Sequence, residues 1–210
     1  YGQATIVDDV IYLAGGQSDL SLDSAMNNFW SLDLSARGNP ESFRWKELEP
    51  WPGPPRTLNL TVAQHDGDHD GVYVMSGRFQ DREEVKFLVD TWQFTPQTGM
   101  WRQRADMLRP AAAGVAAPWR QSHVLVLGGD DGKLFGRADE LKDAHPGFEK
   151  EAFAYHTITD SWTSAGAMPQ NKVTTIPVIW DDQIILACGE IRPRVRTPEV
   201  WSVKPKLRSH

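Results

Sequence analysis

The sequence predicts an all-β protein built from four copies of one short unit. Each copy holds an apolar run that ends in small residues and glycine, at residues 11–16, 72–77, 124–129 and 184–189. The residue that follows each run differs between the copies, namely Gln17, Arg78, Asp130 and Glu190. A second strand-like run follows in every copy, and the first three copies add a third run around Trp45, Trp101 and Trp162. Short strands that recur with glycine and tryptophan are typical of β-propeller blades.

The repeat period of about 50 residues is typical of a kelch-type blade. Glycine lets the backbone turn sharply where an inner strand ends, and we expect the tryptophan to fill the wedge between neighbouring blades. The alternative is an antiparallel sandwich whose strands resemble one another by accident. Because glycine and tryptophan recur in register, the kelch-type β-propeller is the better interpretation.

The chain of 210 residues is interpreted as a single, partial propeller. The expected blades cover residues 1–55, 56–109, 110–171 and 172–205. The fourth unit lacks its last strand, and the chain starts without a spare strand that could complete it. We therefore expect about four blades here, as part of a larger propeller of six blades.

Two insertions interrupt this frame on the side of the propeller where Glu190 is expected. Residues 17–27 are polar and rich in serine, and residues 130–150 include good helix formers over residues 137–144. A helical insertion at this place forms either a wall over a central pocket or a solvated surface excursion.

Composition narrows the classes of partner and site. The chain has 28 acidic and 22 basic residues, a net charge of -6 and no basic stripe, so we expect no nucleic-acid partner. The sequence contains no stretch of 18 apolar residues, so it predicts no membrane-spanning helix. Cys188, the single cysteine, is expected to be a small buried apolar residue. Residues 65–70 resemble a metal site in composition, but a plain polar turn is the preferred interpretation, and we expect no metal and no cofactor.

The densest polar segment covers residues 189–198 and begins directly after the fourth apolar run. Glu190 offers a carboxylate for acid–base chemistry. Arg192, Arg194 and Arg196 follow at alternate positions, so they would share one side of an extended segment and could bind an anion. The alternative interpretation is a cluster of ion pairs on the surface, which would show the same pattern of charged residues.

This segment reads GExxPxxRT, with Gly189, Glu190, Pro193, Arg196 and Thr197 at the fixed positions. The pattern resembles the motif of the bacterial N-acetylneuraminate epimerases, the sialic acid mutarotases, a family with cyclically permuted relatives. Its members are six-bladed kelch propellers in which the motif glutamate is the proposed proton acceptor. The resemblance extends to residues 45–56 and to the long insertion after Gly129, so it covers nearly the whole chain.

The resemblance implies an isomerase that interconverts the α and β anomers of N-acetylneuraminate or a related sialic acid. It assigns the role of base to Glu190 and a substrate contact to Arg196. Arg56 is expected to help orient the substrate anion. Arg194, which stands where the family has glycine, and Arg78, which is not a hallmark of the family, are also expected to bind the substrate. A small sugar acid is the expected partner. The resemblance also implies a periplasmic or secreted location, although no signal peptide is visible.

A second class of function stays open, because propellers are common interaction platforms and the fold alone does not establish chemistry. In that interpretation the chain is a non-catalytic kelch propeller that binds a protein or a glycan. A Glu190 and Arg196 pair that points into solvent would favour it. A copper radical oxidase is disfavoured because Cys188 has no suitable ligand set, and a sialidase because the Ser-x-Asp-x-Gly-x-x-Trp box is missing.

Overall fold

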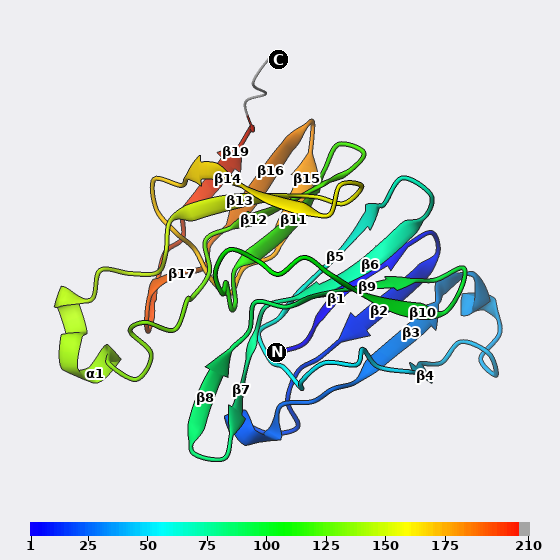
Figure 1. The fold of residues 1–210 in the computed structure, drawn as a ribbon, viewed down its shortest axis with the longest axis horizontal. Coiled ribbons are helices and arrows are strands. Elements are labelled where there is room, and N and C mark those ends of the chain that lie inside the picture. The colour runs from blue at the N-terminus through cyan, green and yellow to red at the C-terminus, as the bar shows by residue number, and fades with distance from the viewer. Residues whose placement is uncertain (206–210) are drawn as a thin grey trace.

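The computed structural model describes residues 1–205, which form four small antiparallel sheets arranged as blades of a β-propeller (Figure 1). Blade 1 contains β1 (Gln3–Val7), β2 (Val10–Ala14), β3 (Phe29–Asp33) and β4 (Lys46–Leu48). Blade 2 contains β5 (Leu60–His65), β6 (Asp70–Met75), β9 (Thr91–Thr95) and β10 (Met100–Arg104). Blade 3 contains β11 (Val115–Trp119), β12 (His123–Leu127), β13 (Glu151–His156) and β14 (Ser161–Ala167). Blade 4 contains β15 (Pro177–Trp180), β16 (Gln183–Ala187) and β19 (Val200–Val203). The predicted all-β propeller is confirmed.

Every blade is a meander in which each strand pairs with the next one of the same blade. The sheets fall inside the residue ranges that the repeat predicts, and blade 4 has three strands where the other blades have four. The kelch assignment and the ring of six blades stay predictions.

Segments inserted between the strands gather on one side of the molecule, as Figure 1 shows. The insertion of blade 3 contains the short helix α1 (Ala138–Leu141) followed by a 3-10 turn over Lys142–Ala144, close to the predicted helical stretch. Blade 4 contributes the hairpin of β17 (Glu190–Arg192) and β18 (Val195–Arg196). Blade 2 contributes the hairpin of β7 (Arg78–Asp81) and β8 (Glu84–Phe87), which the sequence analysis did not anticipate.

Apolar side chains between neighbouring blades form the core. Val62 and Tyr73 of blade 2 pack with Phe153 of blade 3 in one cluster, and similar clusters join blades 1 and 2 and blades 3 and 4. Successive side chains of a strand point to opposite sides of the sheet, so each blade contributes one set of residues to each neighbour. The molecule is therefore stabilised mainly by contacts between blades.

The repeated tryptophans lie at these contacts. The Trp101 indole N–H donates to the carbonyl of Glu49 at 2.8 Å, and that of Trp162 donates to the carbonyl of Ala105 at 2.9 Å. Each bond reaches the segment that leaves the preceding blade, as expected for a wedge residue. Trp45 of blade 1 is 45% exposed, because the described residues place no blade before the first.

A chain of main-chain hydrogen bonds links the blades where each new blade begins. The Leu58 N–H donates to the Tyr1 carbonyl at 3.0 Å, and the Ala113 N–H donates to the Leu58 carbonyl at 2.8 Å. The Thr174 N–H continues the series by donating to the Ala113 carbonyl at 2.9 Å. These bonds fix the spacing of successive blades independently of their side chains.

The expectation that Cys188 is buried is wrong. The cysteine is exposed, and so are Ile176 and Val178 on the same blade. The equivalent side of blade 3 is covered by blade 4, whereas the described residues place no blade against the side of blade 4 that faces away from blade 3. Cys188 is therefore exposed although it follows an apolar strand.

Two further features bear on the kind of site the protein contains. Residues 65–70 form the turn between β5 and β6, in which Asp66 accepts hydrogen bonds from the backbone N–H groups of Asp68 and His69. Within residues 1–205, no cluster of three or more His, Cys, Asp or Glu side chains is arranged to hold a metal ion. No helix in that part of the chain is long and apolar enough to span a membrane.

Candidate functional site

The residue after the glycines is held in the same way in three blades. Arg78, Asp130 and Glu190 each form a two-bond antiparallel bridge with the segment that enters their own blade, at Thr57, Ala112 and Val173 respectively. The four N–H···O distances of Asp130 and Glu190 lie between 2.8 and 3.0 Å. The scaffold thus presents one variable side chain per blade at an equivalent place.

Glycine is required just before these positions. Gly129 has a φ of 100°, in a region that side chains rarely adopt, and an added Cβ would lie 2.5 Å from the Cα of Ala111. Gly77 and Gly189 have φ values of 97° and 105° at the equivalent places. The recurring glycine therefore permits the close backbone approach that forms each bridge.

A cavity of about 890 Å³ lies beside these three side chains. Arg78, Asp130 and Glu190 line it, together with residues of the blade 3 insertion and of the β17–β18 hairpin. Figure 1 shows the insertion and the hairpin β17–β18 on the same side of the molecule as the β7–β8 hairpin. The cavity has the size of a small-molecule site.

Glu190 is half-buried at the cavity wall and begins β17. Its Oε1 atom accepts a hydrogen bond of 2.7 Å from the backbone N–H of Arg194, which orients the carboxylate. Arg196 lies directly opposite Glu190 in the ladder between β17 and β18. The Arg196 side chain is exposed and does not line the cavity.

The arginines after Glu190 do not share one side of an extended segment, contrary to expectation. The chain reverses between β17 and β18, where Arg194 has a φ of 67° in the left-handed region that favours glycine. Arg192 binds the carbonyl of Lys142 at 2.9 Å and the carboxylate of Asp143 at 2.7 Å. Arg194 lines the cavity but forms an ion pair with Asp139. Two of the three arginines therefore hold the insertion.

Arg56 lies elsewhere, in the scaffold. Its side chain is fully buried, its Nη2 atom lies 2.6 Å from Oδ2 of Asp90, and its Nη1 donates to the Ser76 carbonyl at 3.1 Å. The guanidinium also packs over the ring of Trp51 at 5.1 Å. Arg56 is not among the residues that line the cavity, so the structure gives it a bracing role in place of the expected contact with a substrate anion.

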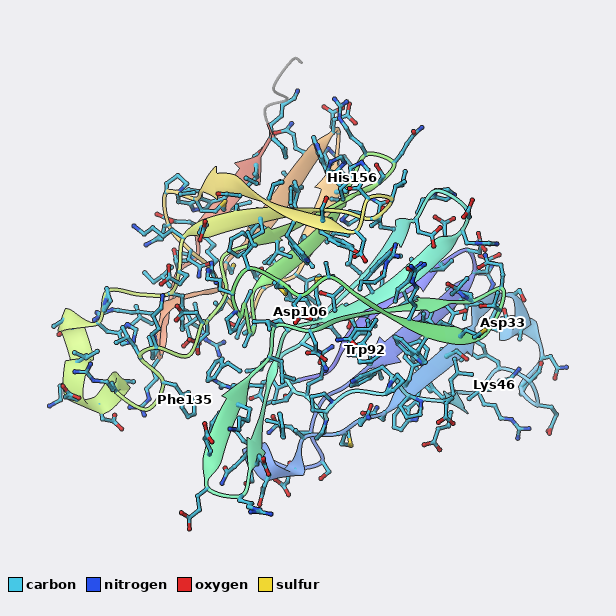
Figure 2. The ribbon with its side chains drawn as sticks, viewed as in Figure 1. Asp33, Lys46, Trp92, Asp106, Phe135 and His156 are labelled. Carbon is cyan, nitrogen blue, oxygen red and sulfur yellow. The ribbon has the colours of Figure 1, made fainter. Side chains whose placement is uncertain are left out.

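Arg78 does line the cavity, at the junction of blades 2 and 3. Its Nη1 atom lies 3.3 Å from Oδ2 of Asp130. Its guanidinium lies over the rings of Phe87 and Phe135, at 5.5 and 4.9 Å from their centroids. Phe135 lies where the insertion faces the β7–β8 hairpin, as Figure 2 shows. Arg78 thus joins the two insertions that border the cavity.

Asp130 is the functional candidate that sequence reasoning missed. Burial raises the pKa of its carboxyl above the ordinary aspartate value, although the N–H of Gly132 and the charge of Arg78 act in the opposite direction. The signal was present in the sequence, because Asp130 occupies the same place after the glycines as Glu190. That Asp130 lies close to Arg78 can be seen only in the folded structure.

Comparison with known proteins gives the cavity a chemical context. A search against protein-family models finds no match. An N-acetylneuraminate epimerase from Yersinia enterocolitica is 25% identical over 97% of this chain, and one from Brucella melitensis is 25% identical over 90%. This chain is similar to N-acetylneuraminate epimerases.

The similarity covers part of those relatives. The chain spans about half the length of the curated relatives it matches, with 55% of the Yersinia enterocolitica protein and 54% of the Brucella melitensis protein covered. The solved structure of YjhT matches with a TM-score of 0.74 and 20% sequence identity over 97% of this chain and 61% of that one. This structural likeness supports the propeller fold.

Proposed function

We propose that this chain belongs to a sugar-acid mutarotase, an isomerase that interconverts the α and β anomers of N-acetylneuraminate or a related sialic acid. The observation that carries the proposal is the half-buried Glu190 carboxylate at the wall of the cavity, which a second carboxyl and a guanidinium from the two preceding blades also line. The similarity to proteins named N-acetylneuraminate epimerase supplies the substrate class.

The reaction needs a base and an acid. In ring opening, Glu190 takes the proton of the anomeric hydroxyl, the bond between the anomeric carbon and the ring oxygen breaks, and the ring oxygen gains a proton. Closure on the other side of the carbonyl gives the other anomer. A carboxylate suits the role of base because general base catalysis requires only a proton acceptor within hydrogen-bond reach of the hydroxyl.

The sugar acid adds a carboxylate that needs a cation. Guanidinium groups bind carboxylates in a bidentate manner. Arg78, Lys133, Lys150 and Arg194 are the cations of the cavity wall. Arg194 and Arg78 already contact Asp139 and Asp130, so a bound sugar acid competes with these carboxylates for the two guanidinium groups. Substrate contacts by Arg78, Arg194 and Arg196 stay proposals, as does a periplasmic or secreted location.

The decisive measurement is anomer exchange. Proton NMR follows freshly released α-N-acetylneuraminic acid as it equilibrates, with and without the purified protein. We expect the wild type to accelerate the exchange and Glu190→Gln to lose this acceleration by a factor of about 100 or more, the usual range for removal of an acid–base group.

Glu47→Gln is the matched control, because Glu47 is exposed on β4 in blade 1, remote in the sequence from every residue of the cavity wall. It should leave the exchange rate unchanged. A Glu190→Gln protein as active as the wild type would remove Glu190 from the mechanism.

One observation favours the alternative of a non-catalytic propeller that binds a protein or a glycan. Arg196 is exposed, so only one member of the pair with Glu190 faces the cavity. In that case the wild type binds the sugar acid, visible as line broadening in the same NMR spectra, without changing the exchange rate.

A further inference from the structure

Asp130 and Glu190 are equivalent positions of neighbouring blades. Each follows a strand and its terminal glycine, and each is bonded through both its N–H and its carbonyl to the segment entering its blade. Both side chains line the same cavity. The repeat therefore places two carboxyl groups at one cavity from two adjacent blades.

The surroundings of Asp130 differ from those of a surface aspartate. Its side chain is 20% exposed, and that of its ion-pair partner Arg78 is 19% exposed. Its Oδ1 atom accepts a hydrogen bond of 3.0 Å from the backbone N–H of Gly132, which fixes the carboxyl. Oδ2 faces Arg78 at 3.3 Å, a distance too long for a tight charged hydrogen bond.

Arg78 is itself held in place from three sides. Its backbone is bridged to Thr57, and the rings of Phe87 and Phe135 contact both its guanidinium and each other, with their centroids 5.6 Å apart. A cation held in this way cannot leave when the charge of Asp130 changes. It is therefore placed to stabilise the aspartate anion that forms when Asp130 loses a proton.

Two carboxyl groups can divide the roles of acid and base when their surroundings differ. Burial favours the protonated form of Asp130. The Glu190 carboxylate accepts a hydrogen bond from the backbone N–H of Arg194. The surroundings of Asp130 therefore suit a proton donor.

We propose that Asp130 is the general acid that protonates the ring oxygen while Glu190 acts as the base, with Arg78 as its positioning residue. The inference rests on the proposed function. In ring opening, Glu190 takes the proton of the anomeric hydroxyl, whose oxygen becomes the carbonyl oxygen, and the bond to the ring oxygen breaks. The electron pair of that bond remains on the ring oxygen, which takes the proton of Asp130.

Ring closure reverses both transfers. The Asp130 carboxylate takes the proton of the same hydroxyl as its oxygen attacks the carbonyl carbon, and the protonated Glu190 returns its proton to the carbonyl oxygen. Each cycle returns both carboxyl groups to their starting states. No oxidant, metal or second substrate is needed for this balance.

Asp130→Asn tests the assignment in the NMR exchange assay. We expect kcat/KM to fall about 100-fold or more, as for loss of a general acid. Asp81→Asn is the matched control, because Asp81 is an exposed aspartate at the end of β7 and does not line the cavity. The control should stay within about twofold of the wild type.

The pH profile separates a catalytic role from a structural one. The wild type should lose activity on the alkaline side as Asp130 gives up its proton, and Asp130→Asn should lose that alkaline limb. A merely structural ion pair between Asp130 and Arg78 would change activity without removing one limb.

A measurement on the wild-type protein tests the proposal even if the Asp130→Asn variant fails to fold. Carboxyl 13C NMR of the wild type should show Asp130 titrating above the ordinary aspartate pKa of about 3.9. An ordinary pKa, or an Asp130→Asn protein with wild-type exchange, overturns the role of Asp130 and leaves the proposed function intact. Failure of the wild type to accelerate exchange overturns the proposed function itself.

Discussion

Two arginines that pair with aspartates show how the same residue type takes different roles in this protein. Arg56 and Arg78 both pair with an aspartate and both pack on aromatic rings, yet only Arg78 borders the cavity. Arg56 bonds three groups of its surroundings and is fully enclosed. A cation so placed stabilises the junction of blades 1 and 2 and has no atom left for a ligand.

Replacement of Arg56 by alanine is therefore a test of stability. Arg56→Ala leaves the Asp90 carboxylate without its partner in a largely buried place, and removing one partner of a buried pair costs about 3–5 kcal/mol. We expect a loss of this size in the free energy of unfolding, measured by urea denaturation. Arg37→Ala, at an exposed position, should change the free energy of unfolding by less than about 0.5 kcal/mol. Equal losses in the two variants would contradict the bracing role.

At the scale of elements, turns and hairpins carry the contacts that join one blade to the next. Asp160, in the turn between β13 and β14, accepts the Ala105 N–H at 2.8 Å and the Tyr155 hydroxyl at 2.7 Å. Arg192 and Arg194 of the β17–β18 hairpin similarly hold the insertion of blade 3. The cavity wall thus depends on hairpins from blades 2, 3 and 4.

The turn at Asp160 predicts a pH dependence of stability. Burial alone would raise the pKa of Asp160, but the hydrogen bonds from Ala105 and Tyr155 outweigh it and hold the pKa below its ordinary value of 3.8. The contribution of Asp160 is therefore present above pH 3.8 and is lost as the pH falls through the lower pKa of the folded state. Asp160→Asn should lower stability at neutral pH and flatten the loss of stability on acidification, followed by thermal unfolding at a series of pH values.

Asparagine is suited to this test because it accepts the positive φ of 54° at position 160. Asp81→Asn serves as the control, since Asp81 is exposed at the end of β7. Its acid unfolding should follow that of the wild type. An Asp160→Asn protein with the same pH dependence as the wild type would rule out the turn as a source of acid sensitivity.

At the scale of the whole molecule, stability comes from the surfaces between blades, and residues 1–205 leave the side of blade 4 that faces away from blade 3 uncovered. Val62, Ala117 and Val178 are equivalent by strand register, since each pairs with the residue two positions before the end of the next strand. Val62 is 3% exposed and Ala117 is fully buried, whereas Val178 is 55% exposed. The exposed fraction of the side chain at this equivalent position therefore differs widely between blades.

This difference predicts unequal effects of one substitution. Val62→Ala removes two buried carbons and should lower the free energy of unfolding by about 1.5–3 kcal/mol, from lost apolar burial and the space left behind. Val178→Ala, the matched control in the same register, should cost less than about 0.5 kcal/mol. Urea denaturation of both variants measures the difference, and similar values would show that the side of blade 4 bearing Val178 is covered in solution.

The propeller could be predicted from the sequence because its repeats enforce the same glycines and tryptophans in each blade. Glu190 could be found because its motif is contiguous. Other features depend on partners distant in the chain, so sequence pattern could not reveal them. Arg56 is neutralised by Asp90, 34 residues later, and Cys188 is exposed because no described blade covers it. The direction of Arg192 and Arg194 depends on a reversal at Arg194, where a non-glycine residue takes a positive φ.

The bridges that hold Arg78, Asp130 and Glu190 use main-chain atoms alone. Any residue except proline, which lacks the N–H donor, can therefore occupy these three places without altering the bonds that hold it, so mutation can exchange the chemistry of the cavity one blade at a time. Divergence toward a new substrate needs no compensating change in the core. The propeller in this way separates what natural selection can vary from what it must preserve.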